Sequence, residues 1–280
     1  MGMQINTNLA ANNTYRNLAS TQTDMAKSLE RLSSGLRINR AADDAAGLAI
    51  SEGLKSQVGG LTVASRNAQD GVSVIQTAEG SLSEVQTILQ RVRDLAVQAG
   101  NGSNNTKSRE AIATEVSALG DELVRISAST NFNGTKLLDA AAGTTPLTFQ
   151  IGAGGVEIED QIKVKLTNVA TIGDAVKTLS TAGFADSAAA LTTINAIDTH
   201  ITAVSTSRAE LGASQNRFES VIRNLAVSKE NLTAAGSRIR DTDMAEEMVK
   251  YTRSSILSQA GTAMLAQANQ SNQGVLTLLR

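Results

Sequence analysis

The sequence predicts a mainly α-helical protein, in which long antiparallel helices with heptad periodicity form a coiled-coil rod and a small β-hairpin segment occupies the middle of the chain. Three observations predict this class. Apolar residues recur in alternating steps of three and four near both ends of the chain, which is typical of helices that bury one stripe against a partner helix. The chain has a single proline, Pro146, so proline does not interrupt its long helices. Around residues 147–166 a period of two replaces the heptad.

Composition narrows the possible functions. The 280 residues include no cysteine and one histidine, His200. These counts exclude disulfides, thiolate chemistry, HExxH zinc sites and Ser-His-Asp triads built from this chain. The stretch Gly152–Gly155 lacks the Lys-Ser/Thr that a phosphate-binding loop needs, so it is predicted to be a hairpin turn. We therefore expect no enzyme activity, no cofactor and no metal.

The same composition argues against nucleic acid and membranes as partners. The formal net charge is −2 and only 2% of the residues are aromatic, which leaves neither a basic field nor a stacking platform for bases. No apolar run approaches the roughly 18 residues that span a bilayer. The N-terminus also lacks the basic, apolar and small-residue order of a secretory signal. We expect no nucleic-acid binding and no membrane insertion.

The first hundred residues predict two helices of unequal strength. Residues 3–17 are polar, rich in Asn and weakly periodic, so helical order there needs help from outside the segment. From Leu18 a narrow apolar stripe continues to a turn at Ser33–Gly35. A long helix is predicted over residues 47–99, and its stripe widens near Leu82. The widened part is too broad for one seam within the chain, so some of it is expected to face another copy: Val85, Ile88, Leu89, Val92 and Leu95.

In the middle of the chain the pattern of apolar residues changes. A shorter helix, antiparallel to the long one, is predicted to begin at Ser108–Glu110 after a Gly/Asn-rich turn, and residues 131–135 read as a second turn. Period-two runs predict strands at 147–151, 156–158 and 162–166, followed by a short helix around Ile172–Leu179. This segment is too small for a good core of its own, so we expect it to pack on the helical rod.

A second long helix begins at Ile194, and a joint is predicted between residues 236 and 243. There Asp241, Thr242 or Asp243 can cap a last helix, with acidic residues in its first turn. The apolar tail at 275–279 is better explained by burial in an assembly than by a monomer. The seam within the rod is predicted to contain Leu61, Val72, Ile75, Leu211, Phe218 and Leu225.

Several long motifs, in order along the chain, closely resemble bacterial flagellin. They are LSSGLRINRAADDAAGLAIS (32–51), LQRVRDLAVQ (89–98), NFNG (131–134), SRIRDTDMAEEM (237–248) and QAGTAMLAQANQ (259–270). The resemblance covers residues 3–139 and 190–280, while the middle matches only in kind. The chain looks like a short flagellin without large outer domains.

The resemblance implies a structural subunit that self-assembles into the bacterial flagellar filament for swimming motility. It implies export in an unfolded state by the flagellar type III system, and a secreted, extracellular location in the flagellum. The implied partners are further copies of the chain, the filament cap and hook-junction proteins, an export chaperone at the C-terminal region, and the host flagellin receptor. A hook–filament junction protein, or another helical protein of a secretion system or appendage, is the alternative.

The resemblance also implies a domain division. Residues 1–44 and 241–280 would form the two halves of an inner coiled-coil domain. Residues 45–140 and 190–240 would form the helical rod domain, and residues 141–189 would be a short variable β segment attached to that rod.

Two sets of site residues follow from the resemblance. The segment that matches LQRVRDLAVQ is the contact for Toll-like receptor 5 in this family, although Asp94 stands where the family often has Glu. The receptor or inter-subunit contacts carried over to this chain are Gln90, Arg91, Leu95, Gln98 and Glu115. The residues expected to assemble the filament core are Leu29, Leu32, Leu36, Met264, Val275, Leu276, Leu278 and Leu279.

Overall fold

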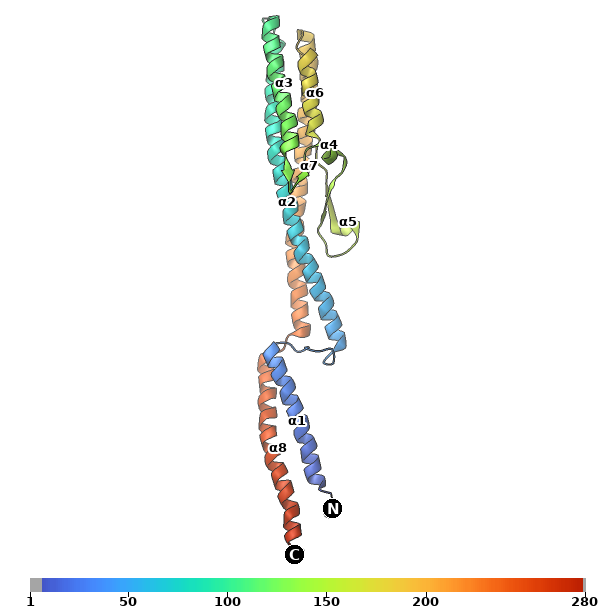
Figure 1. Ribbon diagram of the computed structural model, residues 1–280, viewed down its shortest axis with the longest axis vertical. Coiled ribbons are helices and arrows are strands. Elements are labelled where there is room, and N and C mark those ends of the chain that lie inside the picture. The colour runs from blue at the N-terminus through green and yellow to red at the C-terminus, as the bar shows by residue number, and fades with distance from the viewer. Residues whose placement is uncertain (1–6, 279–280) are drawn as a thin grey trace. The chain divides into compact units, whose positions relative to one another are not determined.

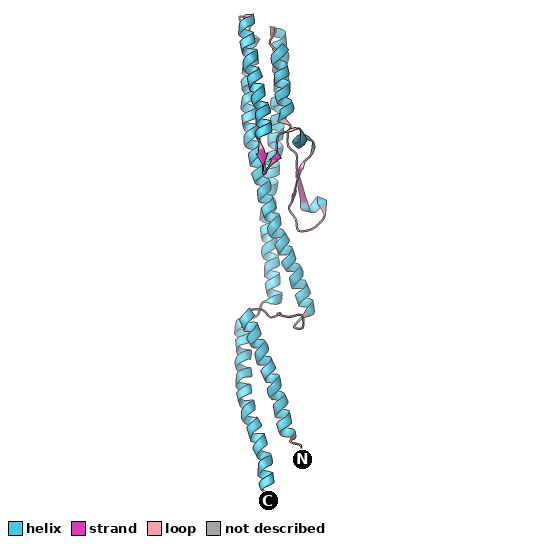
Figure 2. Cartoon of the chain, in the orientation of Figure 1, coloured by secondary structure: helices cyan, strands magenta, loops and turns pink. Residues whose placement is uncertain are grey.

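The computed structural model describes residues 7–278, with side chains over residues 7–270. These residues fall into two compact units, which we describe separately: a central unit, Gln57–Glu230, and a terminal unit made of residues 7–56 and 231–278. Helices dominate both (Figure 2). The elements are α1 (Leu9–Ser34), α2 (Ala45–Ala99), α3 (Thr106–Ser129), β1 (Asn131–Phe132), β2 (Thr135–Lys136), α4 (Ala140–Thr144), β3 (Leu147–Gln150), α5 (Glu157–Asp160), β4 (Gln161–Val164), α6 (Val169–Ala182), α7 (Ser187–Arg240) and α8 (Met244–Leu278).

The predicted fold class is confirmed. The two long heptad helices are present as α2 and α7, and α7 begins seven residues before the predicted start at Ile194. The short helix predicted around Ile172–Leu179 is the longer α6. No helix in the described part of the chain is long and apolar enough to cross a membrane.

In the central unit α2, α3, α6 and α7 lie side by side (Figure 1). The seam residues Ile75, Leu211 and Phe218 are at most 1% exposed, and Leu225 is 8% exposed. Helices α3 and α6 approach closely because Gly120 and Gly173 face each other: a Cβ on Gly173 would lie 3.2 Å from the carbonyl oxygen of Gly120. The heptad pattern therefore builds a closed core from apolar residues of all four helices.

The wide stripe on α2 is buried within the chain, so the expectation that part of it faces another copy is wrong. Val85, Leu89, Val92 and Leu95 are at most 2% exposed, and the half-buried Ile88 packs against the same core. The reason is that α2 contacts α3 as well as α7, as its ion pairs with Glu115 of α3 and Asp198 of α7 indicate. A helix with two partners needs a broader apolar face than a two-helix seam requires.

The β segment contains two antiparallel pairs. Strands β1 and β2 are joined by Asn133 and Gly134, whose φ angles are 47° and 83°. Two consecutive positive φ values define the type I′ hairpin turn, which Asn-Gly favours. Strands β3 and β4 pair from Leu147↔Val164 to Gln150↔Gln161. The first and last of the three predicted strands are therefore confirmed, but they pair with each other, and Gly152–Gly155 lies in a longer connection between them.

The predicted strand at residues 156–158 is wrong, because the short helix α5 stands there and Ile158 is 90% exposed. The cause is Asp160, whose carboxylate accepts hydrogen bonds from the backbone N–H of Gly154 and Val156. Its carbonyl oxygen also accepts from the N–H of Ile151 at 2.7 Å. The chain folds around this one residue instead of extending.

The β3–β4 segment packs on the helices of the central unit, as expected. Asn67 of α2 donates a hydrogen bond from Nδ2 to the Gln150 carbonyl oxygen at 2.9 Å. The rings of Phe149 and Phe218 meet edge to face, with centroids 5.5 Å apart. Gly71 leaves space for this pair, since a Cβ there would lie 2.9 Å from the Phe218 ring.

In the terminal unit α1 and α8 lie side by side (Figure 1). Helix α1 begins at Leu9, well before the stripe that starts at Leu18. Asn8 accounts for the early start: its Oδ1 accepts from the Ala11 N–H, and its Nδ2 donates to the Ala268 carbonyl oxygen of α8, both at 3.0 Å. For the described part of this segment, residues 7–17, the outside help thus comes from the far end of the same chain; residues 3–6 lie outside the described residues.

The joint between the helices is a backbone connection. Helix α1 ends at Gly35, whose φ of 73° suits glycine. Leu36 pairs with Asp241 through a short antiparallel bridge, in which the Thr242 N–H donates to the Gly35 carbonyl oxygen. Of the three candidate caps of α8, Asp243 caps its first turn by accepting from the N–H groups of residues 245 and 246. Helix α7 continues through Gly236, so the break falls at the end of the predicted joint.

Candidate functional site

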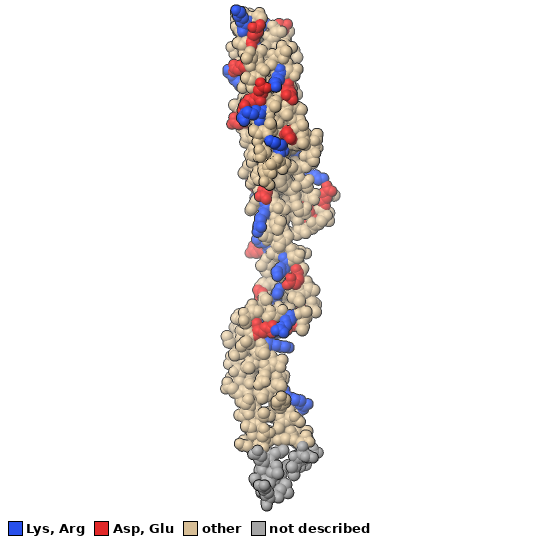
Figure 3. All heavy atoms as spheres, viewed as in Figure 1, with Lys and Arg blue, Asp and Glu red and all other residues tan. Residues whose placement is uncertain are grey.

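The terminal unit leaves large apolar side chains uncovered. Only one residue of α1, the polar Ser28, is buried. The side of α1 and α8 seen in Figure 3 carries few charges, in contrast to the mixed charges over α2, α3 and α7. The large apolar residues about half exposed or more on these two helices are Leu9, Tyr15, Leu29, Met244, Met248, Val249, Ile256, Leu257 and Met264. Exposed apolar surface of this extent is typical of an interface.

Part of this surface forms a groove along α8. Met248, Val249, Ile256 and Leu257 line it, and the space in front of them has a volume of about 420 Å³. Residues 248 and 256, like residues 249 and 257, are spaced by eight positions and so lie on the same side of the helix. Thr252 and Arg253 complete the lining, so the groove is mainly apolar and suits a partner helix.

The structure describes four of the predicted assembly residues with their side chains. Leu29 is 55% and Met264 63% exposed, whereas Leu32 and Leu36 are half-buried. Residues 275, 276 and 278 lie in α8, but their side chains are outside the described part, and Leu279 is outside the described residues altogether. Leu29 and Met264 are thus accessible to a partner.

Charged residues hold the joint of the terminal unit. Two N–H groups, of Asn39 and Arg40, donate to the Asp43 carboxylate, and these hydrogen bonds lower the pKa of Asp43 below its usual value. Arg40 does not pair with Asp43 through its side chain; it donates to Glu30 at 2.9 Å. Arg37 donates to the Ile239 carbonyl oxygen at 2.7 Å, across the joint. The arginines therefore bind α1 and the backbone of α7 rather than the acidic pair beside them in sequence.

The predicted receptor residues are only partly brought together on one surface. Arg91 donates from Nε and Nη2 to Glu115 Oε1 at 3.0 and 2.7 Å, so α2 and α3 present these two side chains as a pair. Gln90 and Gln98 are exposed on α2. Leu95 is only 2% exposed, so its assignment as a direct contact is wrong for the free chain: the side chain packs in the core beneath the exposed residues.

A second ion pair lies close by and was not predicted. Arg93 donates from Nε to Asp198 Oδ1 at 2.6 Å and so links α2 to α7, which raises the pKa of Arg93. The heptad frame could have suggested it, because charged residues that flank a coiled-coil seam often pair across it. The partners are 105 positions apart, so the pairing needs the register of the two helices.

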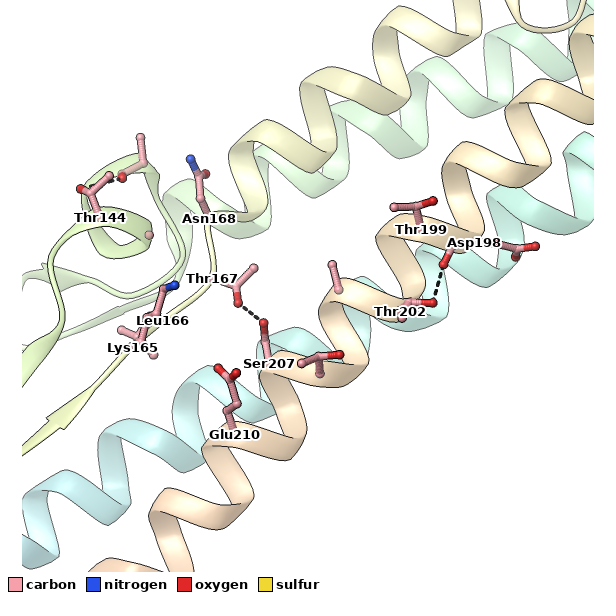
Figure 4. A pocket seen from close by; sticks show the side chains of 14 residues that line it. Thr144, Lys165, Leu166, Thr167, Asn168, Asp198, Thr199, Thr202, Ser207 and Glu210 are labelled. Carbon is pink, nitrogen blue, oxygen red and sulfur yellow. Dashed lines mark hydrogen bonds between the residues drawn. The ribbon is translucent and has the colours of Figure 1, made fainter.

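A groove of about 840 Å³, here called the α7 groove, lies beside Asp198 (Figure 4). One wall is α7, with Thr199, Thr202 and Glu210; the other is the chain around Thr144 and residues 165–168. Its lining is rich in hydroxyl groups, and Thr167 donates a hydrogen bond to Ser207 across it. Such a surface can exchange hydrogen bonds with a polar partner. Sequence reasoning missed it because three separate segments build it.

The chain's histidine does not contribute to this groove. His200 lies one residue beyond Thr199 on α7 and is half-buried. Burial lowers its pKa below the usual value, so the neutral imidazole is favoured.

Comparisons with known proteins match this architecture at both ends. The family model described as the bacterial flagellin N-terminal helical region matches residues 5–142, and the model of the bacterial flagellin C-terminal helical region matches residues 194–279. The chain is 51% identical to a flagellin of Bacillus subtilis (strain 168), over 99% of this chain and all of that protein. It is 44% identical to the flagellar filament 33 kDa core protein of Treponema phagedenis, with the same coverage.

One solved structure supports the fold alone. A putative flagellar hook-associated protein from Vibrio parahaemolyticus aligns with a TM-score of 0.57 over 71% of this chain and all of that chain, at 14% identity. The resemblance seen in the motifs is confirmed by the family models and by identity over nearly the full length. The chain therefore belongs to the bacterial flagellin family.

Proposed function

We propose that this chain is a structural subunit, not an enzyme, that polymerises with copies of itself into a flagellar filament. The observation that carries the proposal is the uncovered apolar face of α1 and α8. Burying apolar surface contributes roughly 25 cal/mol per Å², so covering this face with neighbouring subunits supplies a driving force for assembly. A contact between different faces of successive subunits does not close on itself and so produces a helical filament.

Assembly is coupled to ordering of the termini. In our proposal residues 1–40 and 245–280, of which the structure describes 7–40 and 245–278, become stably helical only in the filament. A pair of helices that buries so little has little to offset the entropy of ordering them in the free subunit. Amide exchange measured on subunit and filament tests this: strong protection at Met264 in the free subunit would contradict it.

The same surface accounts for the partners expected before and during assembly. An apolar groove on α8 needs cover until polymerisation, which is the role of an export chaperone at the C-terminal region. The filament cap and hook-junction proteins meet the subunits at the two ends of the filament. Export by the flagellar type III system delivers the unfolded chain to an extracellular flagellum.

Electron microscopy of the purified chain tests the main proposal. The wild-type chain forms long filaments, whereas a chain that lacks Val275–Arg280 stays unassembled with its central unit folded, as circular dichroism would record. A wild-type chain that forms only short complexes with other flagellar proteins would favour the junction-protein alternative.

A second proposed function is recognition by Toll-like receptor 5. The specific observation is the exposed Arg91–Glu115 pair, flanked on α2 by Gln90 and Gln98. A planar guanidinium is a frequent hot spot of protein interfaces. We also propose that subunits cover this surface in the filament, so that free subunits activate the receptor and filaments do not.

The matched test uses two arginines with similar surroundings. Arg91→Asp reduces receptor signalling by free subunits in reporter cells. Arg125→Asp changes an exposed arginine that pairs with Glu122 on α3, and it leaves signalling intact. Equal signalling by Arg91→Asp and wild-type subunits would reject the assignment of Arg91.

A further inference from the structure

The turn between α2 and α3 contains one of the two Asn-Gly sequences in the chain, Asn101–Gly102. Both residues are exposed to solvent. A Cβ built at Gly102 would meet nothing within 4 Å, so the turn has open space on this side. The other Asn-Gly sequence, Asn133–Gly134, is equally exposed, so accessibility does not distinguish the two.

The turn places the groups needed for an intramolecular reaction next to one another. Asn101 Oδ1 accepts a hydrogen bond from the Ser103 N–H at 3.2 Å. This bond holds the side-chain amide against the backbone two residues further on, and the nitrogen of Gly102 lies between the two bonded residues in sequence. The Gly102 N–H donates no hydrogen bond to a described residue, so no bond of this group opposes loss of its proton. The rotation that closes the ring disturbs one backbone hydrogen bond of the turn, from the Asn104 N–H to the Asn101 carbonyl oxygen at 3.2 Å.

We infer that Asn101 is a site of spontaneous deamidation. The Gly102 nitrogen gives its proton to water or hydroxide and attacks Asn101 Cγ, forming the new C–N bond and placing negative charge on Oδ1. The Ser103 N–H stabilises that charge in the manner of an oxyanion hole. The Cγ–Nδ2 bond then breaks, and ammonia leaves after taking up a proton. Nothing is oxidised or reduced.

Water completes the reaction by opening the five-membered succinimide ring. Attack at Cγ gives aspartate, and attack at the backbone carbonyl gives isoaspartate, which carries one more methylene in its backbone. Either product has a carboxylate in place of the amide and a mass greater by about 1 Da.

The hairpin protects Asn133 from the same reaction. Asn133 and Gly134 are held at positive φ between paired strands, with Phe132 opposite Thr135. Closing the ring requires rotation about the Asn Cα–C bond, which breaks this pairing. The Asn133 side chain also accepts no hydrogen bond from a described residue, so it lacks the counterpart of Ser103.

The carboxylate formed at residue 101 would carry a negative charge at an unfavourable position. Asn101 follows the C-terminus of α2, whose last turn contains no basic residue. Negative charge is disfavoured at the C-terminus of a helix. The same turn anchors the start of α7, because Ser187 Oγ donates to the Gly100 carbonyl oxygen at 2.9 Å. Deamidation therefore loosens this end of the central unit.

Peptide mass spectrometry of the aged full-length chain tests the inference, with electron-transfer fragmentation to separate isoaspartate from aspartate. We expect the modified fraction at Asn101 to grow with time and pH, several-fold faster than at Asn133. Gly102→Ala slows the reaction at Asn101 and leaves Asn133 unchanged. In guanidinium chloride, which removes the structure, the two sites react at similar rates.

Equal rates at the two sites in the folded protein would overturn the inference, as would faster reaction at Asn133. A difference between the sites that persists in guanidinium chloride would assign it to the neighbouring sequence and would also overturn the structural account.

Discussion

The central and terminal units are built from the same kind of helix and reach opposite results. In the central unit four helices enclose a core, and the largest seam residues are almost fully buried. In the terminal unit α1 and α8 lie together and leave nine of their described large apolar side chains about half exposed or more. The difference shows that periodicity alone does not make a core: a stripe also needs enough partner helices to cover it. The central unit buries its apolar stripes within one chain, whereas the terminal unit needs other chains to bury its own.

The most direct way to break this comparison uses two valines with equal exposure. Val249 on α8 and Val227 on α7 are both 58% exposed, and they belong to the terminal and central units respectively. We expect Val249→Asp to abolish filament formation, because it places a charge in the α8 groove, and Val227→Asp to leave filaments intact. Sedimentation and electron microscopy measure both. Loss of assembly in Val227→Asp alone would move the interface to the central unit.

The next comparison concerns stability. Leu211 of the central unit is 1% exposed, and Leu257 of the terminal unit is 53% exposed. Leu211→Ala should lower the free energy of unfolding by about 2–5 kcal/mol, while Leu257→Ala should change it little in the free subunit. Urea denaturation followed by circular dichroism gives both values. A cost at Leu257 similar to that at Leu211 would mean that the free subunit already buries α8.

The same contrast exists on a smaller scale inside the β segment. Ile162 in β4 is 1% exposed, and Ile158 in α5 is 90% exposed. Ile162→Val should destabilise the central unit by about 0.5–1.5 kcal/mol, and Ile158→Val should have no measurable effect. Thermal unfolding of both variants checks the placement of α5. An equal loss of stability in the two variants would instead support a strand at residues 156–158, as the sequence pattern predicts.

The smallest expected effect is a pH dependence from His200. Burial lowers the pKa of His200 in the folded state below the unfolded value of about 6.5, so the unfolded chain binds the proton more readily. The resulting stability is fully present above that unfolded value and falls as the pH drops through it. His200→Gln should remove this part of the loss between pH values of about 7.5 and 5.5. If the melting temperatures of the wild-type protein and the variant fall in parallel over this range, His200 does not contribute to the pH dependence.

The sequence predicted most of the central unit because its signals are local and repeated. Heptads predicted α2 and α7, and Asn133–Gly134 predicted a turn. The errors arose where the hydrogen bonds of one polar side chain decide a local structure. Asp160 turns a run of alternating apolar residues into a loop and a short helix. Asn8 starts α1 early through its contact with α8. The pattern of apolar residues predicts neither of these two effects.

Site prediction had the same limit. The motif resemblance identified the pair Arg91 and Glu115, which the structure brings together. It did not predict that Leu95, one helical turn further on α2, is buried. A wide apolar stripe has the same sequence pattern whether it packs on α3 or on another chain. The α7 groove beside Asp198 depends on three segments, so no single motif encodes it.

The length of α2 and α7 has a consequence for how the chain is cut by proteases. Both helices are shared between the two units: α2 has residues 45–56 in one and 57–99 in the other, and α7 is likewise divided after Glu230. The boundary is therefore crossed by two helices and not by an extended linker. When the terminal unit loosens, these helices fray from Ala45 and Arg240 toward the core, one turn after another. A protease should accordingly yield a ladder of closely spaced products in place of one sharp cut.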